Sequence, residues 1–288
     1  MTILITGANG QVGQCFRQLA ATYPDWQFVF ADIDEVDITE RKAVFSVFKN
    51  LDGAGLQWCI NCAAYTAVDK AESEPLLARR INVNGARYLA EACAARGIPV
   101  VHLSTDYVYH NRQNTPFVET DAVSPKSVYA RTKLAGDRAV LRANPQAMVI
   151  RTSWVYSPFG ANFVKTMLRL GAERPELKVV FDQIGTPTYA PDLAAAILSI
   201  IKQSEKTSFS GIWHYSNEGV TSWYDFARAI FEIRGIDCRV SPIVTAEYPT
   251  PAARPPFSVL NKAKIKDAFG LEIPHWRESL RHCLALLP

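Results

Sequence analysis

Hydrophobic positions in the first half of the chain follow two alternating spacings. Short continuous apolar runs, typical of strands buried on both faces, alternate with longer segments whose apolar residues recur every three or four positions, as in helices. The predicted strands lie within residues 2–6, 28–32, 58–64, 99–105 and 147–156, and the predicted helices within 10–23, 39–50 and 78–97. This order predicts an α/β fold of the Rossmann type, with a doubly wound parallel sheet covered by helices on both faces.

The pattern loosens after about residue 150. Proline becomes frequent, and helices are predicted at 162–170 and 222–234 between loops. We therefore expect two domains, a larger one over residues 1–150 and a smaller C-terminal one over residues 151–288. Some elements of the second domain are expected to return to the main sheet.

The composition indicates a globular protein with a sizeable core, because 48% of the 288 residues are hydrophobic and 20% are charged. The formal net charge is only +3, and the scattered lysines and arginines argue against a nucleic-acid-binding protein. The most apolar late stretch, residues 192–201, is well short of the roughly twenty residues that cross a bilayer. The N-terminal apolar run reaches glycine at residue 7, too early for a signal peptide. We expect a cytoplasmic protein that binds neither nucleic acid nor membrane.

The cysteines and histidines have no metal-ligand spacing. Cys59 and Cys62 form a C-x-x-C, which is also the spacing of a redox pair. They fall within a predicted strand, where residues three apart point to opposite faces, so we interpret them as small buried apolar residues. The five histidines show no suitable spacing with one another or with cysteine, and we predict no metal site.

Three glycines directly follow the first predicted strand and begin the first predicted helix, at Gly7, Gly10 and Gly13. In this context they are typical of a dinucleotide-binding turn, in which backbone approaches a pyrophosphate at a helix N-terminus. Asp32 ends the second strand about twenty residues later, where a carboxylate accepts hydrogen bonds from the adenosine ribose. The alternative is that Asp32 only begins a turn. No lysine or arginine occurs in the following residues 33–39, which favours acceptance of NADH.

Tyr129 and Lys133 lie one helical turn apart and therefore share a helix face. Alone, such a pair is more often a solvated surface, but a dinucleotide site gives it a chemical use. Reduction of a ketone by hydride places negative charge on oxygen, and a tyrosine can donate the proton if a nearby ammonium lowers its pKa. Ser104 and Thr105 end a predicted strand and supply hydroxyls that could orient the ketone.

Longer motifs carry a family resemblance. The chain has T-G-x-x-G-x-x-G at residues 6–13 and Y-x-x-x-K at 129–133, with further characteristic strings at 61–75, 104–109, 119–137, 151–156, 162–170, 182–194 and 216–227. Together they resemble the dTDP-4-dehydrorhamnose reductases of the extended short-chain dehydrogenase/reductase superfamily. The resemblance implies hydride transfer from NADH or NADPH to the C4 ketone of dTDP-4-dehydro-L-rhamnose, the last step of dTDP-rhamnose biosynthesis.

The resemblance also implies residue roles. Tyr129 is the expected proton donor, Lys133 its tuning partner, and Thr105 the hydroxyl that orients the carbonyl. The cofactor is expected to contact Tyr129 and Lys133 together with Gly7, Gly10, Gln11, Val12, Gly13, Asp32, Asp37, Ile38, Ala63, Ala64 and Tyr65. The dTDP-sugar is expected to contact Thr105, Asp106, Trp154 and Asn162.

Some aromatic and acidic residues have simpler interpretations. Trp154 could be a core aromatic and Asp106 a turn residue. Core packing is sufficient for Trp223 and Tyr224, which have helical spacing with other apolar residues. Residues 248–258 are expected to close over the nucleotide.

Two departures from the family bear on assembly. Some relatives hold a divalent metal at a dimer interface through acidic residues, whereas Cys15 and Pro191 stand at the corresponding positions here. We therefore expect no bridging metal and either a monomer or a weak homodimer.

Two other functions stay open. One is a sugar-nucleotide epimerase or dehydratase of the same superfamily, but a dehydratase needs a second carboxylate where Tyr107 follows Asp106. The other is a non-catalytic NADP-binding regulatory subunit of the same fold. The joint presence of Thr105, Tyr129 and Lys133 favours an enzyme.

Overall fold

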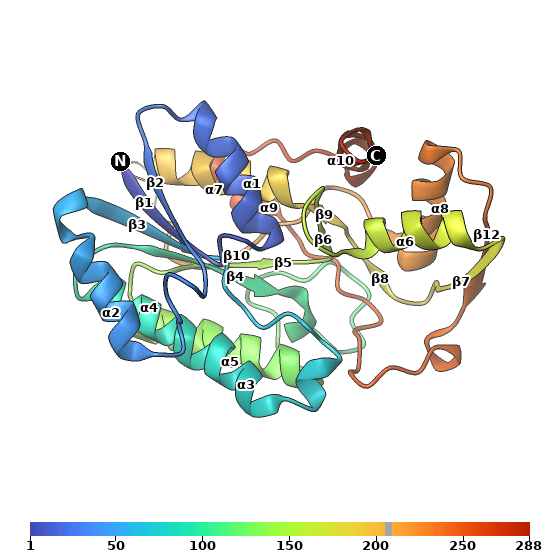
Figure 1. Ribbon diagram of the computed structural model, residues 1–288. Coiled ribbons are helices and arrows are strands. Elements are labelled where there is room, and N and C mark those ends of the chain that lie inside the picture. The colour runs from blue at the N-terminus through green and yellow to red at the C-terminus, as the bar shows by residue number, and fades with distance from the viewer. Residues whose placement is uncertain (205–208) are drawn as a thin grey trace.

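A six-stranded parallel sheet forms the centre of the computed structural model, which describes residues 1–204 and 209–288 (Figure 1). The strand order is β10-β5-β4-β3-β1-β2, and every neighbouring pair is parallel. The strands are β1 (Thr2–Thr6), β2 (Gln27–Ala31), β3 (Leu56–Asn61), β4 (Val100–Thr105), β5 (Met148–Thr152) and β10 (Gly211–His214). The predicted doubly wound parallel sheet is confirmed.

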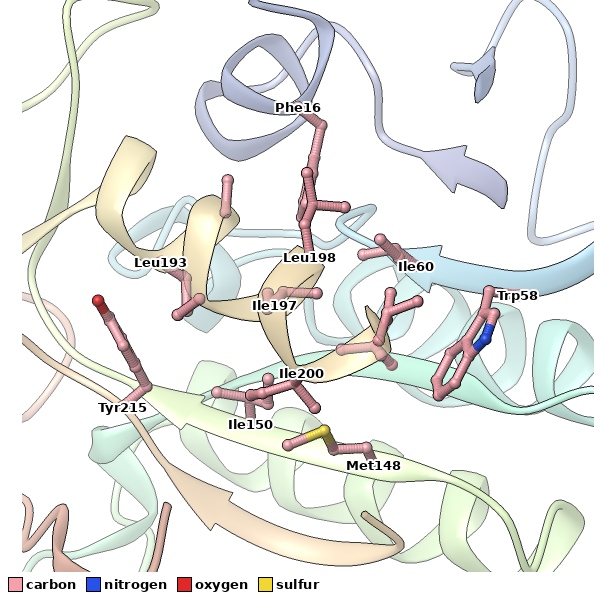
Figure 2. Packing of buried hydrophobic residues seen from close by; sticks show 14 of the residues in the cluster. Phe16, Trp58, Ile60, Met148, Ile150, Leu193, Ile197, Leu198, Ile200 and Tyr215 are labelled. Carbon is pink, nitrogen blue, oxygen red and sulfur yellow. The ribbon is translucent and has the colours of Figure 1, made fainter. Parts of the chain in front are cut away.

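Helices cover both faces of this sheet (Figure 1). One face carries α1 (Gln11–Leu19), α7 (Ala190–Gln203) and α9 (Ala263–Phe269), and the other carries α2 (Arg41–Asn50), α4 (Ala86–Ala94) and α5 (Val128–Ala143). Because strand side chains alternate in direction, Ile3 and Ile5 pack with α1 and α7, whereas Leu4 packs with α2 and α4. Figure 2 shows Ile197 and Ile200 of α7, which belong to the same hydrophobic core as Ile3 and Ile5.

The second half of the chain adds a smaller unit beside the sheet (Figure 1). Its core joins α6, α8, α10, β7 and β12. The elements of this unit are β6 (Val155–Tyr156), α6 (Phe163–Glu173), β7 (Glu176–Val180), β8 (Ile184–Gly185), β9 (Thr188–Tyr189), β11 (Thr221–Ser222), α8 (Trp223–Arg234), β12 (Arg239–Ile243) and α10 (Trp276–Ala285). Strands β7 and β12 pair in parallel, as do β6 and β9, whereas β8 and β11 are antiparallel. Strand β10 and helix α7, also from the second half, belong to the main sheet and its cover.

The helix predicted over residues 78–97 is interrupted. It consists of α3 (Pro75–Arg79), a π-helical segment (Arg80–Gly85) and α4. The π-helical segment carries Asn82, whose side chain accepts the N–H of Tyr65 at 2.8 Å and donates to the Thr132 hydroxyl at 3.1 Å. These polar bonds explain an irregular segment that apolar periodicity cannot reveal, and π-helical turns often occur near functional sites.

Short 3₁₀ turns connect several elements. They are Ala20–Thr22, Asp52–Ala54, Lys70–Glu72, Asp106–Val108 and Thr245–Glu247. The helix predicted at 10–23 accordingly ends at Leu19 and continues as the first of these turns. Among the described residues, no helix has both the length and the apolar character that a bilayer crossing requires.

Candidate functional site

A cleft of about 1070 Å³ lies where the strands of the main sheet end. Its walls come from the glycine loop, the residues that follow β2, β3 and β4, the first turns of α5, and the smaller unit. The carboxyl ends of parallel strands are the usual ligand-binding edge of such sheets. The sequence motifs therefore converge on one cavity.

The glycine loop depends on the absence of side chains at two positions. Gly7 has a φ of +67°, and a Cβ there would lie 2.5 Å from the backbone nitrogen of Ala63. A Cβ at Gly13 would lie 2.4 Å from the carbonyl oxygen of Gly7. Gly10 caps α1 without any side-chain hydrogen bond, so the first N–H groups of the helix stay available to an anion.

Asp32 follows β2 and lines the cleft, as do Asp37 and Ile38. Its carboxylate accepts the N–H of Asn9 at 2.7 Å, which ties this acid to the glycine loop. Arg80, from the π-helical segment, also lines this part of the cleft and donates to Thr39 at 3.1 Å. Sequence reasoning placed no cation here because Arg80 is distant along the chain, and only the fold brings it to the same wall.

The segment after β3 is held by Asn82. Ala63 and Ala64 line the cleft as expected, but Tyr65 does not. The Tyr65 hydroxyl instead donates to a Glu74 carboxylate oxygen at 2.7 Å. Of the residues expected to contact cofactor or substrate, Tyr65 is the one that the fold does not bring to the cavity wall.

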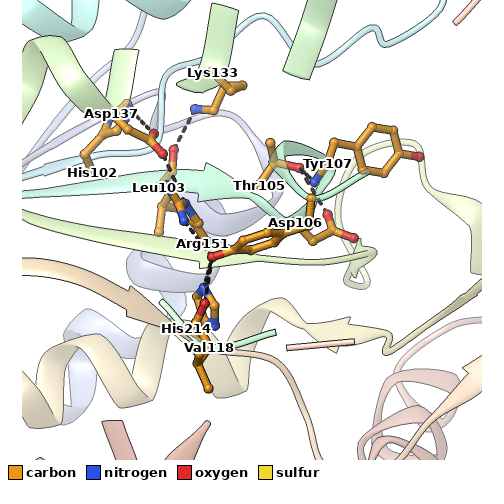
Figure 3. A network of polar contacts seen from close by, with 11 residues as sticks. His102, Leu103, Thr105, Asp106, Tyr107, Val118, Lys133, Asp137, Arg151 and His214 are labelled. Carbon is orange, nitrogen blue, oxygen red and sulfur yellow. Dashed lines mark hydrogen bonds and ion pairs between the residues drawn. The ribbon is translucent and has the colours of Figure 1, made fainter. Parts of the chain in front are cut away.

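Thr105, Tyr129 and Lys133 come together on one wall. Thr105 ends β4, and its hydroxyl donates to Asp106 at 3.1 Å and accepts the N–H of Tyr107 at 3.2 Å (Figure 3). Tyr129 and Lys133 project from the first turns of α5, and the Lys133 ammonium donates to the Leu103 carbonyl at 2.6 Å (Figure 3). The helical spacing thus places the phenol and the amine beside the end of β4.

Burial shifts the pKa values of Tyr129 and Lys133 in the directions that favour their uncharged forms. It raises the pKa of Tyr129 to about 12, although a hydrogen bond with Thr105 acts in the opposite direction. It lowers the pKa of Lys133 to about 8, against the attraction of Asp137. The expected lowering of the Tyr129 pKa by Lys133 is not found, because desolvation of the phenol dominates and the nearby Asp106 and Asp137 carboxylates raise the pKa further. At neutral pH the site contains a protonated phenol beside an ammonium.

Asp106 is more than a turn residue. It is 1% exposed, lines the cleft, and has one buried carboxylate oxygen without a hydrogen-bond partner. Burial raises its pKa to about 7, while the nearby Ser258 and Thr105 hydroxyls favour the charged form. An unpaired buried acceptor in a cavity wall is suited to a ligand hydroxyl. Its neighbour Tyr107 packs edge-on to Tyr129, with ring centroids 5.8 Å apart.

Trp154 and Trp223 form a stacked pair in the cleft wall. Their ring centroids are 3.6 Å apart and their planes differ by 10°. Trp154 has a φ of +46°, unusual for a residue with a Cβ, and a Cβ at Gly185 would lie 2.6 Å from its ring. The assignment of Trp223 to core packing was therefore incomplete, and periodicity gives no means of distinguishing a cleft face from a core face here.

Asn162 joins the smaller unit to the glycine loop. Its side chain accepts the N–H of Lys165 as the N-cap of α6, and it donates to Gln11 at 3.0 Å and to the Ser157 carbonyl at 2.8 Å. Asn162 and Gln11 both line the cleft, as does Val12. The N-terminus of α6 accordingly opens into the cavity.

Cys59 and Cys62 do not share an environment. Cys59 is buried in β3, as expected, whereas Cys62 follows the end of the strand and lines the cleft. Both thiols are free. Within residues 1–204 and 209–288, no group of three or more histidine, cysteine, aspartate or glutamate side chains is arranged to hold a metal ion.

Comparison with known proteins gives matches over the whole chain. The family model described as RmlD substrate binding domain matches residues 1–287. A dTDP-4-dehydrorhamnose reductase of Sinorhizobium fredii is 43% identical over 98% of this chain and 96% of that protein. The crystal structure of a dTDP-4-dehydrorhamnose reductase from Clostridium acetobutylicum is 42% identical, with a TM-score of 0.92 over 99% of each chain. A Bacillus anthracis enzyme of the same name, solved in complex with NADP, is 38% identical, with a TM-score of 0.92 over 99% of this chain and 98% of that one.

Proposed function

This chain belongs to the family of the RmlD substrate binding domain, whose relatives are dTDP-4-dehydrorhamnose reductases, and we infer that it performs their reaction. It reduces the C4 ketone of dTDP-4-dehydro-L-rhamnose with NADPH or NADH and forms dTDP-L-rhamnose, the last step of dTDP-rhamnose biosynthesis. The observation that carries this function is the grouping of Thr105, Tyr129 and Lys133 in the cleft that also contains the glycine loop.

The residues of the first half fit a dinucleotide. The uncapped N-terminus of α1, with Gly7, Gly10 and Gly13 allowing close approach, suits the pyrophosphate. Asp32 is proposed to accept a ribose hydroxyl. Together with Gln11, Val12, Asp37, Ile38, Ala63 and Ala64, these residues are proposed to hold the cofactor, whose nicotinamide supplies the hydride.

Proton transfer is proposed to come from Tyr129. As hydride reaches C4, negative charge develops on the ketone oxygen, and the Tyr129 phenol donates its proton there to form the alcohol. The Lys133 ammonium stabilises the phenolate that remains. Thr105 hydrogen-bonds the ketone oxygen and fixes its position between the donor groups.

The sugar nucleotide is proposed to lie against the second half of the chain. The free carboxylate oxygen of Asp106 accepts a sugar hydroxyl, and the Trp154–Trp223 stack provides a flat apolar surface. The diphosphate lies near Asn162, at the N-terminus of α6. On this basis residues 1–150 bind the dinucleotide, and residues 151–288 supply most of the substrate contacts.

The cofactor preference is open to a direct test. A carboxylate at Asp32 favours a free ribose 2′-hydroxyl and repels a 2′-phosphate, so NADH is expected to be used as well as NADPH. Replacing Asp32→Ser is expected to raise the KM for NADH more than the KM for NADPH. Steady-state kinetics with each cofactor would measure this, and equal changes for the two cofactors would contradict the assignment.

The assembly proposed is a monomer or a weak homodimer without a bridging metal. Cys15, at one of the two positions where the resemblance implies an acidic residue in some relatives, is a buried free thiol. EDTA is expected to leave both activity and mass in solution unchanged, as measured by light scattering. A chelator-sensitive dimer would contradict this.

One assay tests the function as a whole. The protein is mixed with dTDP-4-dehydro-L-rhamnose and NADPH or NADH, cofactor oxidation is followed by absorbance, and the product is identified by mass. Oxidation in proportion to dTDP-L-rhamnose is expected. A regulatory subunit would bind cofactor without turnover, and a dehydratase or epimerase would leave the reduced cofactor unconsumed.

A further inference from the structure

A cluster of charged and titratable side chains lies behind the catalytic wall, and the proposed reaction does not use all of it. It consists of Lys133 and Asp137 on α5, His102 on β4 and Arg151 on β5, and we call it the Asp137 cluster (Figure 3). All four residues are between 1% and 2% exposed. Burying charges is costly, so a buried group of this kind calls for an explanation.

The two carboxylate oxygens of Asp137 have different surroundings. Oδ2 lies 3.3 Å from Nε of Arg151, within hydrogen-bond reach. Oδ1 makes no hydrogen bond and lies 3.9 Å from Nε2 of His102. The Ser104 hydroxyl on β4 also favours the charged form of Asp137. Asp137 is therefore only partly neutralised by Arg151.

His102 does not supply the missing charge. Its Nδ1 lies 3.0 Å from the Asn61 amide nitrogen, which can only donate, so Nδ1 accepts and Nε2 carries the proton in the neutral ring. Burial and the positive charge of Lys133 hold the pKa of His102 well below its usual range. His102 therefore faces Asp137 as a neutral N–H.

Arg151 is fixed from its other side. Its Nη1 donates to the Tyr109 hydroxyl at 2.6 Å. His214 Nδ1 lies 3.0 Å from the Phe117 carbonyl and must donate to it, so His214 Nε2 accepts from the Tyr109 hydroxyl at 2.8 Å. This chain of hydrogen bonds holds the guanidinium in place. The Asp137 carboxylate is bonded to Arg151 and is also attracted by Lys133, which is one helical turn away on α5.

Asp137 is the anion available to Lys133. The other titratable groups that face the lysine are Tyr129 on α5, His102 on β4 and Cys62 after β3. Burial raises the pKa of the Cys62 thiol and that of Tyr129, so both are uncharged at neutral pH. Burial raises the pKa of Asp137 as well, but the attraction of Arg151 and Lys133 favours its charged form. Asp137, one helical turn from Lys133 on the same buried face, is therefore the group left to offset the cost of burying an ammonium.

We propose that Asp137 is a positioning residue of the reduction, which favours the ammonium form of Lys133, while Arg151 keeps the Asp137 carboxylate ionised. The inference rests on the role proposed above for Lys133. It predicts that the ionisation of Lys133 follows the charge on Asp137.

The first test is Asp137→Asn, with Asp137→Glu as the charge-retaining control. The pH dependence of kcat is measured with saturating NADPH and sugar substrate. In the wild type, kcat is expected to fall at alkaline pH as Lys133 loses its proton, and we call this fall the alkaline limb. In the Asn variant the alkaline limb is expected to move to lower pH by about one unit or more, since a nearby opposite charge shifts a pKa by about that amount. At pH 6, where Lys133 is charged in either case, kcat is expected to approach the wild-type value. The Glu variant should restore the limb.

The second test is Arg151→Met, which removes the cation that favours the charged form of Asp137 and is expected to move the alkaline limb to lower pH. Arg151→Lys, which retains the positive charge, should leave the limb near its wild-type position. Tyr109→Phe keeps every charge of the Asp137 cluster and should leave the limb in place. A purely structural role would lower the Tm and reduce kcat at every pH without moving the limb, and that result would overturn the proposal. Should Asp137→Asn fail to fold, Arg151→Met decides alone, and an unmoved or raised limb would contradict the inference.

Lys133→Met separates this inference from the proposed function. If turnover and the alkaline limb survive that change, the role of Lys133 itself is wrong. If the limb is lost in Lys133→Met but stays in place in Asp137→Asn, only the role of Asp137 fails.

Discussion

Burial favours the uncharged forms of both Tyr129 and Lys133, and the resulting protonation states still suit proton transfer to a ketone. Burial raises the pKa of the phenol to about 12 and lowers that of the amine to about 8. The phenol is therefore in its donor form throughout the physiological range, and the amine is still mostly an ammonium at pH 7. The proton needed by the ketone oxygen is present, and so is the cation that stabilises the phenolate.

These shifts predict the pH dependence of turnover. The ammonium of Lys133 is lost as pH rises through about 8, so kcat is expected to fall above that value. The carboxylate of Asp106 is lost as pH falls through about 7, so the KM for the sugar is expected to rise below that value. Steady-state kinetics across this range would resolve both effects. A kcat that stays constant well above pH 8 would contradict the role of Lys133.

Removing the Tyr129 hydroxyl tests the proton donor. Tyr129→Phe is expected to lower kcat by about 10²- to 10⁴-fold, the usual contribution of general acid catalysis, while cofactor affinity stays near normal. Tyr224→Phe is a matched control, because its hydroxyl accepts a hydrogen bond from Arg228 outside the cleft. Turnover and cofactor titration by fluorescence would measure the two quantities. Unchanged turnover would remove Tyr129 from the mechanism.

The roles of individual residues could be predicted from the sequence where their separation along the chain determines their separation in the structure. Tyr129 and Lys133 share a helix, and Asp32 follows the strand next to the glycine loop, so sequence distance was a sufficient guide. Arg80 and Trp223 reach the cleft only through tertiary packing. Their positions were therefore missed, and burial reversed the expected direction of the Tyr129 pKa because sequence spacing contains no information about desolvation.

At the scale of elements, the loop at 248–258 is fastened to the segment after β3. The Arg254 guanidinium binds the Asp69 carboxylate through two bonds, at 3.1 and 2.7 Å, and Asp69 also accepts the N–H of Ala252 at 3.1 Å. Val68, next to Asp69, lines the cleft, and Ser258 lies close enough to Asp106 to favour its charged form. The ion pair thus connects two loops that border the proposed sugar site.

Breaking this ion pair is expected to affect substrate binding more than stability. The side chain of Asp69 is 41% exposed, so solvent screening limits the loss of stability to about 1 kcal/mol or less. Asp69→Ala and Arg254→Ala are each expected to raise the KM for the dTDP-sugar while the KM for NADPH stays constant. The double variant should be no worse than either single one, because both remove the same contact. Additive effects on KM would show that the two residues act independently.

Elements were predictable where periodicity alone determines them. Continuous apolar runs identified the strands of the first half, and the glycine triplet identified the start of α1. The π-helical segment at Arg80–Gly85 was not predictable, because the side-chain bonds of Asn82 leave no trace in the apolar pattern. Strand β10 is short and was also not identified, although a return to the main sheet was expected.

At the scale of the molecule, the two halves of the chain share one core. Strand β10 pairs with β5 at the edge of the main sheet. Helix α7 covers the same sheet face as α1, and Leu193, Ile197, Ile200 and Ile201 of α7 are at most 1% exposed. A boundary near residue 150 therefore separates proposed binding roles, but the sheet of the first half is completed by the second.

A fragment of residues 1–150 tests this dependence. With Leu198, which is also fully buried, α7 buries five large side chains, and these contribute about 7 to 15 kcal/mol, since each such side chain contributes about 1.5 to 3 kcal/mol. This is comparable with the whole stability of a typical domain, about 5 to 15 kcal/mol, and the fragment also lacks the edge strand β10. We therefore expect the fragment to bind a hydrophobic dye and to lack a cooperative thermal transition, whereas the full chain unfolds cooperatively. A fragment that melts cooperatively and binds NADPH would establish instead that the first half folds on its own.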